Sequence, residues 1–232
     1  MNNDESVQRG HAIRKEILRI LSHSSISEAL CALTRNHTVT VCDGLLSGDV
    51  TAAICEELGN DIGWQRECWL IDTDQQVRRV DLATFELSSA GQRFSFNDCL
   101  RQPAPTAFAL RGFLSAAASS TATEVLENCI GQKLRACSTD IARYRRGDYL
   151  RRHCDNFGGR RVGFVWFFAS GWKQGDGGEL VVEDEFGRAQ VIQPLGGRIV
   201  SLVLGEHSFH QVAQLTSSTW SRYSIAMHFG MS

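Results

Sequence analysis

The chain has 232 residues, 22% of them charged, and a formal net charge of −2. The length fits a single domain, residues 1–232, that can bury a core without disulfide staples. The charge balance gives no electrostatic basis for binding nucleic acid or an acidic membrane surface. The longest apolar run, residues 162–170, is too short to cross a bilayer, so we expect no membrane segment.

Eight cysteines are spread along the chain, with no C-x-x-C pair and no zinc-finger spacing. Several lie within apolar runs, as Cys42 does in residues 38–42, which is typical of buried reduced thiols. The N-terminus has no apolar segment of the signal-peptide kind. Together these features predict a cytoplasmic protein.

The N-terminal half begins with helical patterns. Apolar residues at helical spacing predict helices over residues 5–22 and 27–33, a helical extension that we assign to residues 1–35. Residues 38–42 are expected to form a strand, and residues 47–58 a helix with Ser47 as its N-cap.

The next part of the chain, residues 36–135, is expected to support the core with both helices and strands. Alternation and β-branched residues predict strands at 67–72 and 79–87. Residues 88–105 are polar and contain Gly91 and two of the three prolines, so we predict a loop. Residues 107–137 are rich in Ala and Leu and are predicted to be helical in two pieces.

The pattern changes after residue 136, where short strand-like runs follow one another to the C-terminus. They cover residues 140–144, 149–155, 162–169, 179–183, 189–193, 198–204, 210–215 and 222–229. So many short strands separated by glycine-containing turns favour a barrel or jelly roll. The expected fold is mostly β with supporting helices, with its core at residues 136–230.

Within this β-rich half, His153 and Asp155 are two residues apart on a predicted strand. Residues at i and i+2 point to the same face, so the imidazole and the carboxylate can reach one metal ion. His210, at the head of a later strand, can supply a third ligand. Two histidines and one carboxylate leave three open positions on an octahedral ion, as in non-haem iron(II) oxygenases.

Arg222 heads the last predicted strand. A guanidinium binds a carboxylate through two parallel hydrogen bonds, and an unpaired buried charge is costly. An arginine near the metal is therefore expected to hold the distal carboxylate of a keto acid such as 2-oxoglutarate, whose other end chelates the ion.

Five segments, in this order, resemble motifs of the prolyl 4-hydroxylase superfamily. They are RYRRGDYLRRHCDN at 143–156, GGEL at 177–180, PLGGR at 194–198, HQV at 210–212 and RYSI at 222–225. The resemblance covers roughly residues 136–230 and is nearest to the oxygen-sensing and bacterial prolyl hydroxylases.

The resemblance implies a double-stranded β-helix of the jelly-roll or cupin-like kind. It also implies Fe(II), 2-oxoglutarate and O2, with ascorbate as a possible reductant. On its motifs, Tyr144 would hydrogen-bond the 2-oxoglutarate carboxylate and Tyr149 would lie close to the substrate. Two departures stand out: the spacing from His210 to Arg222 is longer than in the oxygen-sensing branch, and Trp166-Phe167 replace tyrosines.

Other residues near these motifs have simpler explanations. His207 could replace His210 as a ligand, but the spacing to Arg222 favours His210. His228 is on the same strand face as Arg222, so it could lie near the mouth of the pocket, but a surface histidine is the favoured interpretation. Trp172, in the polar glycine-rich loop 170–178, is a candidate substrate contact.

The sequence thus predicts an enzyme, a 2-oxoglutarate-dependent iron dioxygenase that hydroxylates an unactivated C–H bond and releases succinate and CO2. Asp155 argues against a halogenase, in which a small residue replaces this carboxylate. The alternative is a metal-binding cupin-like barrel without this catalysis, which would not need Arg222 or Tyr144. The sequence does not identify the substrate, which is a small molecule, a peptide or a protein. It also leaves open desaturation or cyclisation in place of hydroxylation, and the oligomeric state.

Overall fold

The computed structural model describes residues 3–33, 39–74, 76–155 and 159–231. Its helices are α1 (Asn3–Leu21), α2 (Ser24–Leu33), α3 (Gly48–Asn60), α4 (Leu82–Leu87), α5 (Phe108–Ala117) and α6 (Ser120–Ile130). Its strands are β1 (Val39–Cys42), β2 (Trp64–Ile71), β3 (Val77–Val80), β4 (Arg93–Leu100), β5 (Leu134–Tyr144), β6 (Tyr149–Cys154), β7 (Arg160–Phe167), β8 (Leu180–Glu183), β9 (Ala189–Ile192), β10 (Ile199–Val203), β11 (Phe209–Val212) and β12 (Arg222–Met231).

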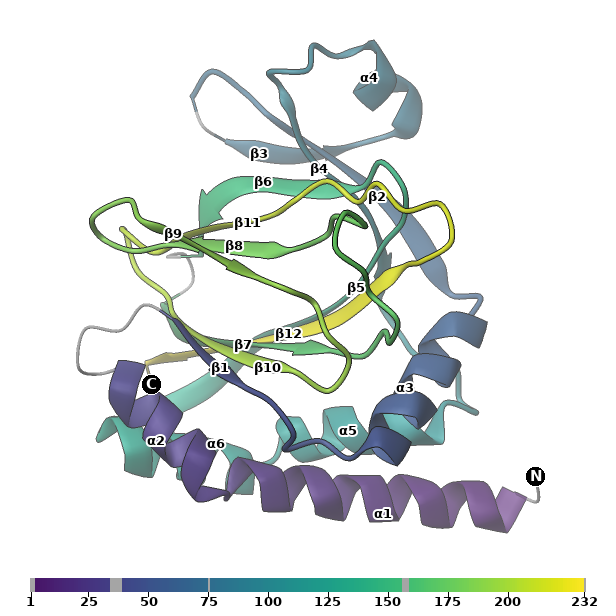
Figure 1. The fold of residues 1–232 in the computed structure, drawn as a ribbon, viewed down its shortest axis with the longest axis vertical. Coiled ribbons are helices and arrows are strands. Elements are labelled where there is room, and N and C mark those ends of the chain that lie inside the picture. Colours follow the sequence, from purple (N-terminus) through teal and green to yellow (C-terminus); the bar gives the residue numbers. More distant parts are fainter. Residues whose placement is uncertain (1–2, 34–38, 75, 156–158, 232) are drawn as a thin grey trace.

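The strands form one antiparallel sheet in the order β1-β10-β7-β12-β5-β4-β6-β11-β8-β9, with β2 and β3 attached beside β4. The sheet curls so that its two ends face each other, which Figure 1 shows as β8 and β9 lying across from β7 and β10. Phe167 of β7 and Leu180 of β8 belong to one buried cluster between the two ends. The expected jelly-roll core with supporting helices is confirmed.

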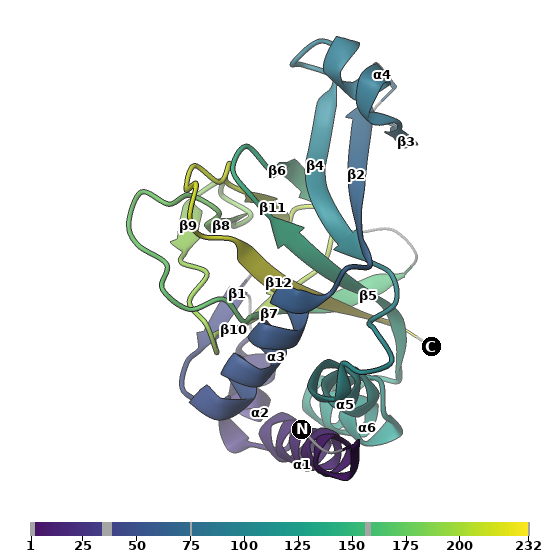
Figure 2. The ribbon, with the colours of Figure 1, turned by 90° about the vertical axis from the view of Figure 1, so that its right-hand side faces the viewer.

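Helices α1, α2, α3, α5 and α6 cover the outer face of the β1-β10-β7-β12-β5 part of the sheet, whereas α4 lies apart, beside β2 and β3 (Figures 1 and 2). The predicted apolar stripe of α1 is buried there at Ile13, Ile17 and Ile20. Helices α1 and α5 touch through glycines, since a Cβ on Gly112 would lie only 2.4 Å from the Gly10 carbonyl oxygen. Ser47 caps α3 as predicted, accepting a hydrogen bond from the Val50 amide. No helix among the described residues is both long and apolar enough to span a membrane.

The strands predicted after residue 136 are all present, each within a few residues of its expected ends, except that β5 begins earlier, at Leu134. Two predictions before that point are wrong. The strand expected at 79–87 ends at Val80, and α4 follows because Asp81 caps it by accepting a hydrogen bond from the Thr84 amide. The loop expected at 88–105 contains β4, which pairs with both β5 and β6 and so connects the two halves of the sheet.

A cluster of buried charges explains how the polar segment of β4 can form an inner strand. Asp98 is buried and accepts hydrogen bonds from Arg143 and Arg145, and it also pairs with Arg66 at 3.1 Å. Arg66 bridges onward to Asp148, which is also buried. The cluster thereby connects β2 and β4, the two strands that project in Figure 2, to β5 and to the turn between β5 and β6. Complementary arginines from elsewhere in the chain make this burial possible.

Candidate metal centre and its pocket

Among the described residues, one group of His, Cys, Asp and Glu side chains could hold a metal ion: His153, Asp155 and His210. One ligand atom from each lies within 4.8 Å of the others. His153 of β6 and His210 of β11 are paired directly across the two strands, with ring centroids 4.2 Å apart. The structure thus brings together the three residues that the sequence predicted as ligands.

A bulge in β6 sets the direction in which His153 points. His210 is opposite His153 but Val212 is opposite Leu150, so two residues of β6 face one residue of β11. An extra residue reverses the alternation of side chains along a strand. Leu150 therefore packs with Val212 and Tyr144 inside the barrel, on the side of His153, whereas Tyr149 packs with Phe96 outside it.

Hydrogen bonding prepares His153 for a metal. Its Nδ1 lies 2.9 Å from the carbonyl oxygen of Arg151 and can only donate to it, which leaves the Nε2 lone pair free. Burial and the neighbouring His153 lower the pKa of His210 to about 4, so its ring is neutral at neutral pH. Neutral imidazoles are the form that binds metal.

Asp155 completes the group and has two further neighbours. Its Oδ1 is 3.2 Å from Nη1 of Arg160, and its Oδ2 is 3.2 Å from Nε2 of His228. Burial on its own would raise the pKa of Asp155. The hydrogen bond from His228 and the imidazoles of His210 and His153 outweigh that effect and hold the pKa well below its usual range.

The interpretation of His228 as a surface histidine is wrong. Only 8% of the residue is exposed, and the ring reaches the carboxylate of Asp155. The alternation of side chains along the last strand puts His228 on the same face as Arg222, and this was the signal in the sequence that pointed to a buried position. The contact of Arg160 with Asp155 had no signal in the sequence, since it depends on how β7 lies beside the end of β6.

Arg222 is fully enclosed on the inner face of β12. Its guanidinium carbon lies 4.9 Å from the ring centres of both Tyr144 and Phe167, and Nε and Nη1 make no hydrogen bond. Burial lowers the pKa of Arg222 to about 10 and raises the pKa of Tyr144 to about 12. At neutral pH the arginine is therefore a buried cation with unsatisfied donors, which requires an anionic partner.

Small side chains lie between Arg222 and His228 along β12. Ser224 and Ala226 lie between them on the same, inner face of the strand. Ser224 is paired with Ala142 of β5. Gly163 of β7 is opposite His228. The side chains between the guanidinium and the metal group on this face of β12 are therefore small.

The glycine pair of the GGEL segment brings loop 170–178 against Arg222. Gly177 has a φ of +75°, and a Cβ there would lie 2.2 Å from the carbonyl oxygen of Gln214. A Cβ on Gly178 would lie 3.7 Å from Cδ of Arg222. Trp172 is half-buried and donates its indole N–H to the Gly177 carbonyl, so this residue lies in the loop at the Arg222 end of the pocket.

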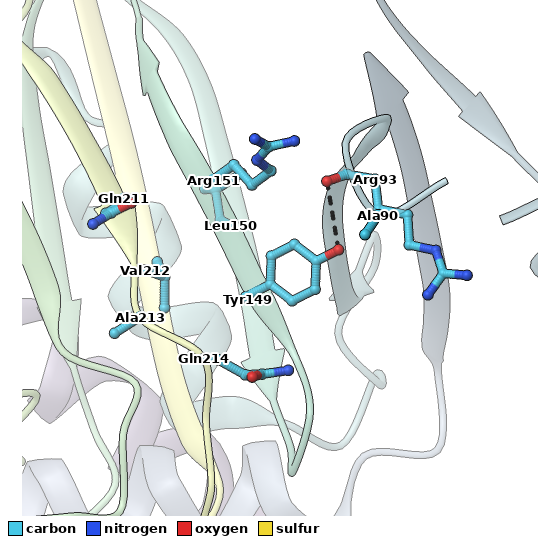
Figure 3. Close-up of a pocket in the computed structure, with 9 residues that line it drawn as sticks. All are labelled: Ala90, Arg93, Tyr149, Leu150, Arg151, Gln211, Val212, Ala213 and Gln214. Carbon is cyan, nitrogen blue, oxygen red and sulfur yellow. Dashed lines mark hydrogen bonds between the residues drawn. The ribbon is translucent and has the colours of Figure 1, made fainter. Parts of the chain in front are cut away.

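Tyr149 lies in a separate, open groove between β4 and the outer side of β6 and β11. Figure 3 shows its hydroxyl pointing to the carbonyl oxygen of Arg93, at 3.5 Å, with Arg151 nearby. The groove lies on the side of β6 away from Tyr144 and Arg222. The structure therefore does not bring Tyr149 to the other predicted site residues.

The match to known families agrees with this geometry. Residues 139–230 match the sequence model of the 2OG-Fe(II) oxygenase superfamily. That segment contains His153, Asp155, His210 and Arg222. This segment is thus similar to the 2OG-Fe(II) oxygenases, oxidoreductases that require Fe(II), 2-oxoglutarate and O2.

Solved structures with this fold include two prolyl hydroxylases and an epimerase. A Pseudomonas putida prolyl-4-hydroxylase is 20% identical, with a TM-score of 0.62, and the alignment covers 88% of this chain and 99% of that one. A Trichoplax adhaerens prolyl hydroxylase, bound to a fragment of hypoxia inducible factor, is 14% identical, with a TM-score of 0.65 and coverage of 89% and 90%. The epimerase SnoN from nogalamycin biosynthesis is 11% identical, with a TM-score of 0.56 and coverage of 89% and 83%. At these identities the likeness establishes the fold.

Proposed function

We propose that His153, Asp155 and His210 hold Fe(II), that Arg222 binds the distal carboxylate of 2-oxoglutarate, and that the enzyme hydroxylates an unactivated C–H bond. The observation that carries the proposal is the buried guanidinium of Arg222, with two nitrogens that make no hydrogen bond. It is separated from the metal group by small side chains. Both halves of a chelating keto acid therefore have a complementary partner.

The protein residues have distinct tasks in this reaction. Bound Fe(II) supplies the oxidation, in which 2-oxoglutarate and O2 yield succinate, CO2 and one oxygen atom for the substrate. Arg222 orients the co-substrate through paired hydrogen bonds. The rings of Tyr144 and Phe167 lie against that guanidinium and shield it from water, which strengthens its attraction for a carboxylate. We also propose that Tyr144 directs its hydroxyl at the same carboxylate.

The substrate class is the finer part of the proposal. Prolyl residues in a peptide or protein are the first choice, because the structures with this fold include prolyl hydroxylases. A free amino acid or a natural-product intermediate is the second, since an epimerase of natural-product biosynthesis shares the fold. We propose that Trp172 contacts the substrate near the Arg222 end of the site. We propose that Tyr149 contacts the part of a long substrate that lies in the outer groove. We also propose a cytoplasmic location and ascorbate as a reductant that sustains turnover.

The test is succinate formation by purified protein with Fe(II), 2-oxoglutarate and O2. We expect it to require iron and to stop in His153→Ala, while the exposed His207→Ala keeps wild-type turnover. Mass spectrometry of free amino acids, peptides and cell lysate would identify the substrate by the gain of one oxygen. A metal-binding barrel without catalysis would bind iron yet form no succinate, and that result would overturn the proposal.

A further inference from the structure

His228 lies against the metal group, although the proposed reaction gives it no task. It comes from β12, on the side of the curled sheet that lies across from β6 and β11, and its side chain is buried. Its Nε2 is 3.2 Å from Oδ2 of Asp155, closer than Nε2 of His210, which is 3.6 Å from the same oxygen. Its ring is not part of the group whose ligand atoms lie within 4.8 Å of one another, so its geometry is that of a partner of Asp155 and not of a fourth ligand.

The hydrogen bonds around His228 form a ring, beside which Oδ2 of Asp140 lies 3.5 Å from His228 Nδ1 and 3.4 Å from Ser138 Oγ. Arg160 Nη2 donates to Ser138 Oγ at 2.8 Å, and Ser138 Oγ is 2.9 Å from His228 Nδ1. If the serine hydroxyl donates to Nδ1, then Nε2 carries the proton and donates to Asp155. Arg160 Nη1 lies 3.2 Å from the other carboxylate oxygen and completes the ring. Each oxygen of Asp155 thus faces one fixed donor.

The position of Asp155 in the chain explains why its carboxylate needs such support. Strand β6 ends at Cys154, and the pair formed by Cys154 and Phe209 is the last one on that side. Among the described residues, the ladder of β6 therefore ends before Asp155. Donors from β7 and β12 replace the ladder as the restraint on the side chain.

We propose that His228 is a positioning residue that holds the carboxylate of Asp155 in the orientation required for ligating the metal. The inference rests on the proposed iron site. It assigns to His228 a hydrogen bond that a packing residue of the same size would not provide. Partners of metal ligands typically change metal affinity by about 10- to 100-fold when they are removed.

The experiment is a titration of the metal-free protein with Co(II), without co-substrate or substrate, followed by the visible absorption of the bound ion. We expect His228→Ala and His228→Phe to weaken Co(II) binding by about 10- to 100-fold. The phenylalanine keeps the ring volume but removes both nitrogens. His228→Gln keeps a donor near Nε2 and is expected to recover most of the affinity, and His207→Ala to match the wild type.

Two controls separate the possible failures. His153→Ala should abolish the Co(II) spectrum; if it binds like the wild type, the proposed metal site itself is wrong. If His153→Ala fails to bind while His228→Phe binds Co(II) as tightly as the wild type, the metal site stands and the role of His228 is refuted. The same holds if Gln and Phe at position 228 weaken binding equally. Thermal unfolding of each metal-free variant verifies that the fold is retained.

Discussion

The protein buries carboxylates among cations in two places, and the two places differ in how completely the charges are paired. Asp98 is surrounded by Arg66, Arg143 and Arg145, all within hydrogen-bond or ion-pair distance. Asp155 has one donor on each oxygen, Arg160 and His228 at 3.2 Å, but the two imidazoles of the metal group lie 3.6 and 3.7 Å away, too far for hydrogen bonds. Near that second place, Arg222 is enclosed with no acidic partner in ion-pair distance among the described residues.

The difference separates structural charge from charge that awaits a ligand. Around Asp98 the protein supplies every partner, and the cluster joins β2, β4 and β5. Near Asp155, the guanidinium of Arg222 has two buried nitrogens without a hydrogen bond, which is costly in the free protein. Substitutions in the two places should therefore affect stability in opposite directions.

The largest effect on stability is expected from Asp98→Asn. Removing this charge leaves three arginines without their shared partner, and we expect a loss of about 3 kcal/mol in the free energy of unfolding. Urea unfolding measures it. Glu183→Gln, which breaks the more exposed ion pair with Arg152, is the matched control and should cost less than about 1 kcal/mol. Equal losses in the two variants would show that the Asp98 cluster does not hold the fold together.

Arg222→Met should have the opposite signature. Losing the buried guanidinium is expected to weaken 2-oxoglutarate binding by about 30-fold or more, which corresponds to about 2 kcal/mol or more. Without ligand the variant should be at least as stable as the wild type, because an unpaired buried charge is removed. Calorimetric titration and thermal unfolding give the two values. If the ligand-free variant is destabilised as much as Asp98→Asn, Arg222 has a structural role instead.

A smaller effect follows from the lowered pKa of His210. Below the usual histidine pKa of about 6.5 the unfolded chain takes up a proton, whereas the folded His210 does not until about pH 4. The unfolded state then binds more protons, so stability of the metal-free protein should fall by about 2 kcal/mol from pH 7 to pH 5. Urea unfolding at each pH measures this slope. It should flatten in His210→Gln and persist in His207→Ala; an unchanged slope in His210→Gln would contradict the assignment.

The strands of the barrel could be predicted because each has a local pattern of alternation. The same rule failed at β4, where Ser95, Asn97 and Asp98 give a polar segment typical of loops. Its burial depends on arginines that lie far away in the sequence, and no local pattern contains them. The bulge in β6 was likewise invisible in the sequence, and it separates Tyr149, which the motif resemblance put close to the substrate, from the face of His153.

His228 shows the same limit within the site. A single histidine near the end of a strand is usually exposed, but here Gly163 on the neighbouring strand leaves room for its ring. Ser138 and Arg160 come from two other strands to fix its orientation. Three separate segments decide the environment of one side chain.

The sequence by itself determined the kinds of ligand, two histidines and a carboxylate, and the arginine that follows them, because these are chemical identities with a fixed order along the chain. It also determined the jelly-roll core, because alternation is local. Only the tertiary structure decided which of these groups lack a partner within the protein. Whether a buried charge has a partner depends on segments brought together by the curled sheet, and that pairing separates the Asp98 cluster from the pocket of Asp155 and Arg222.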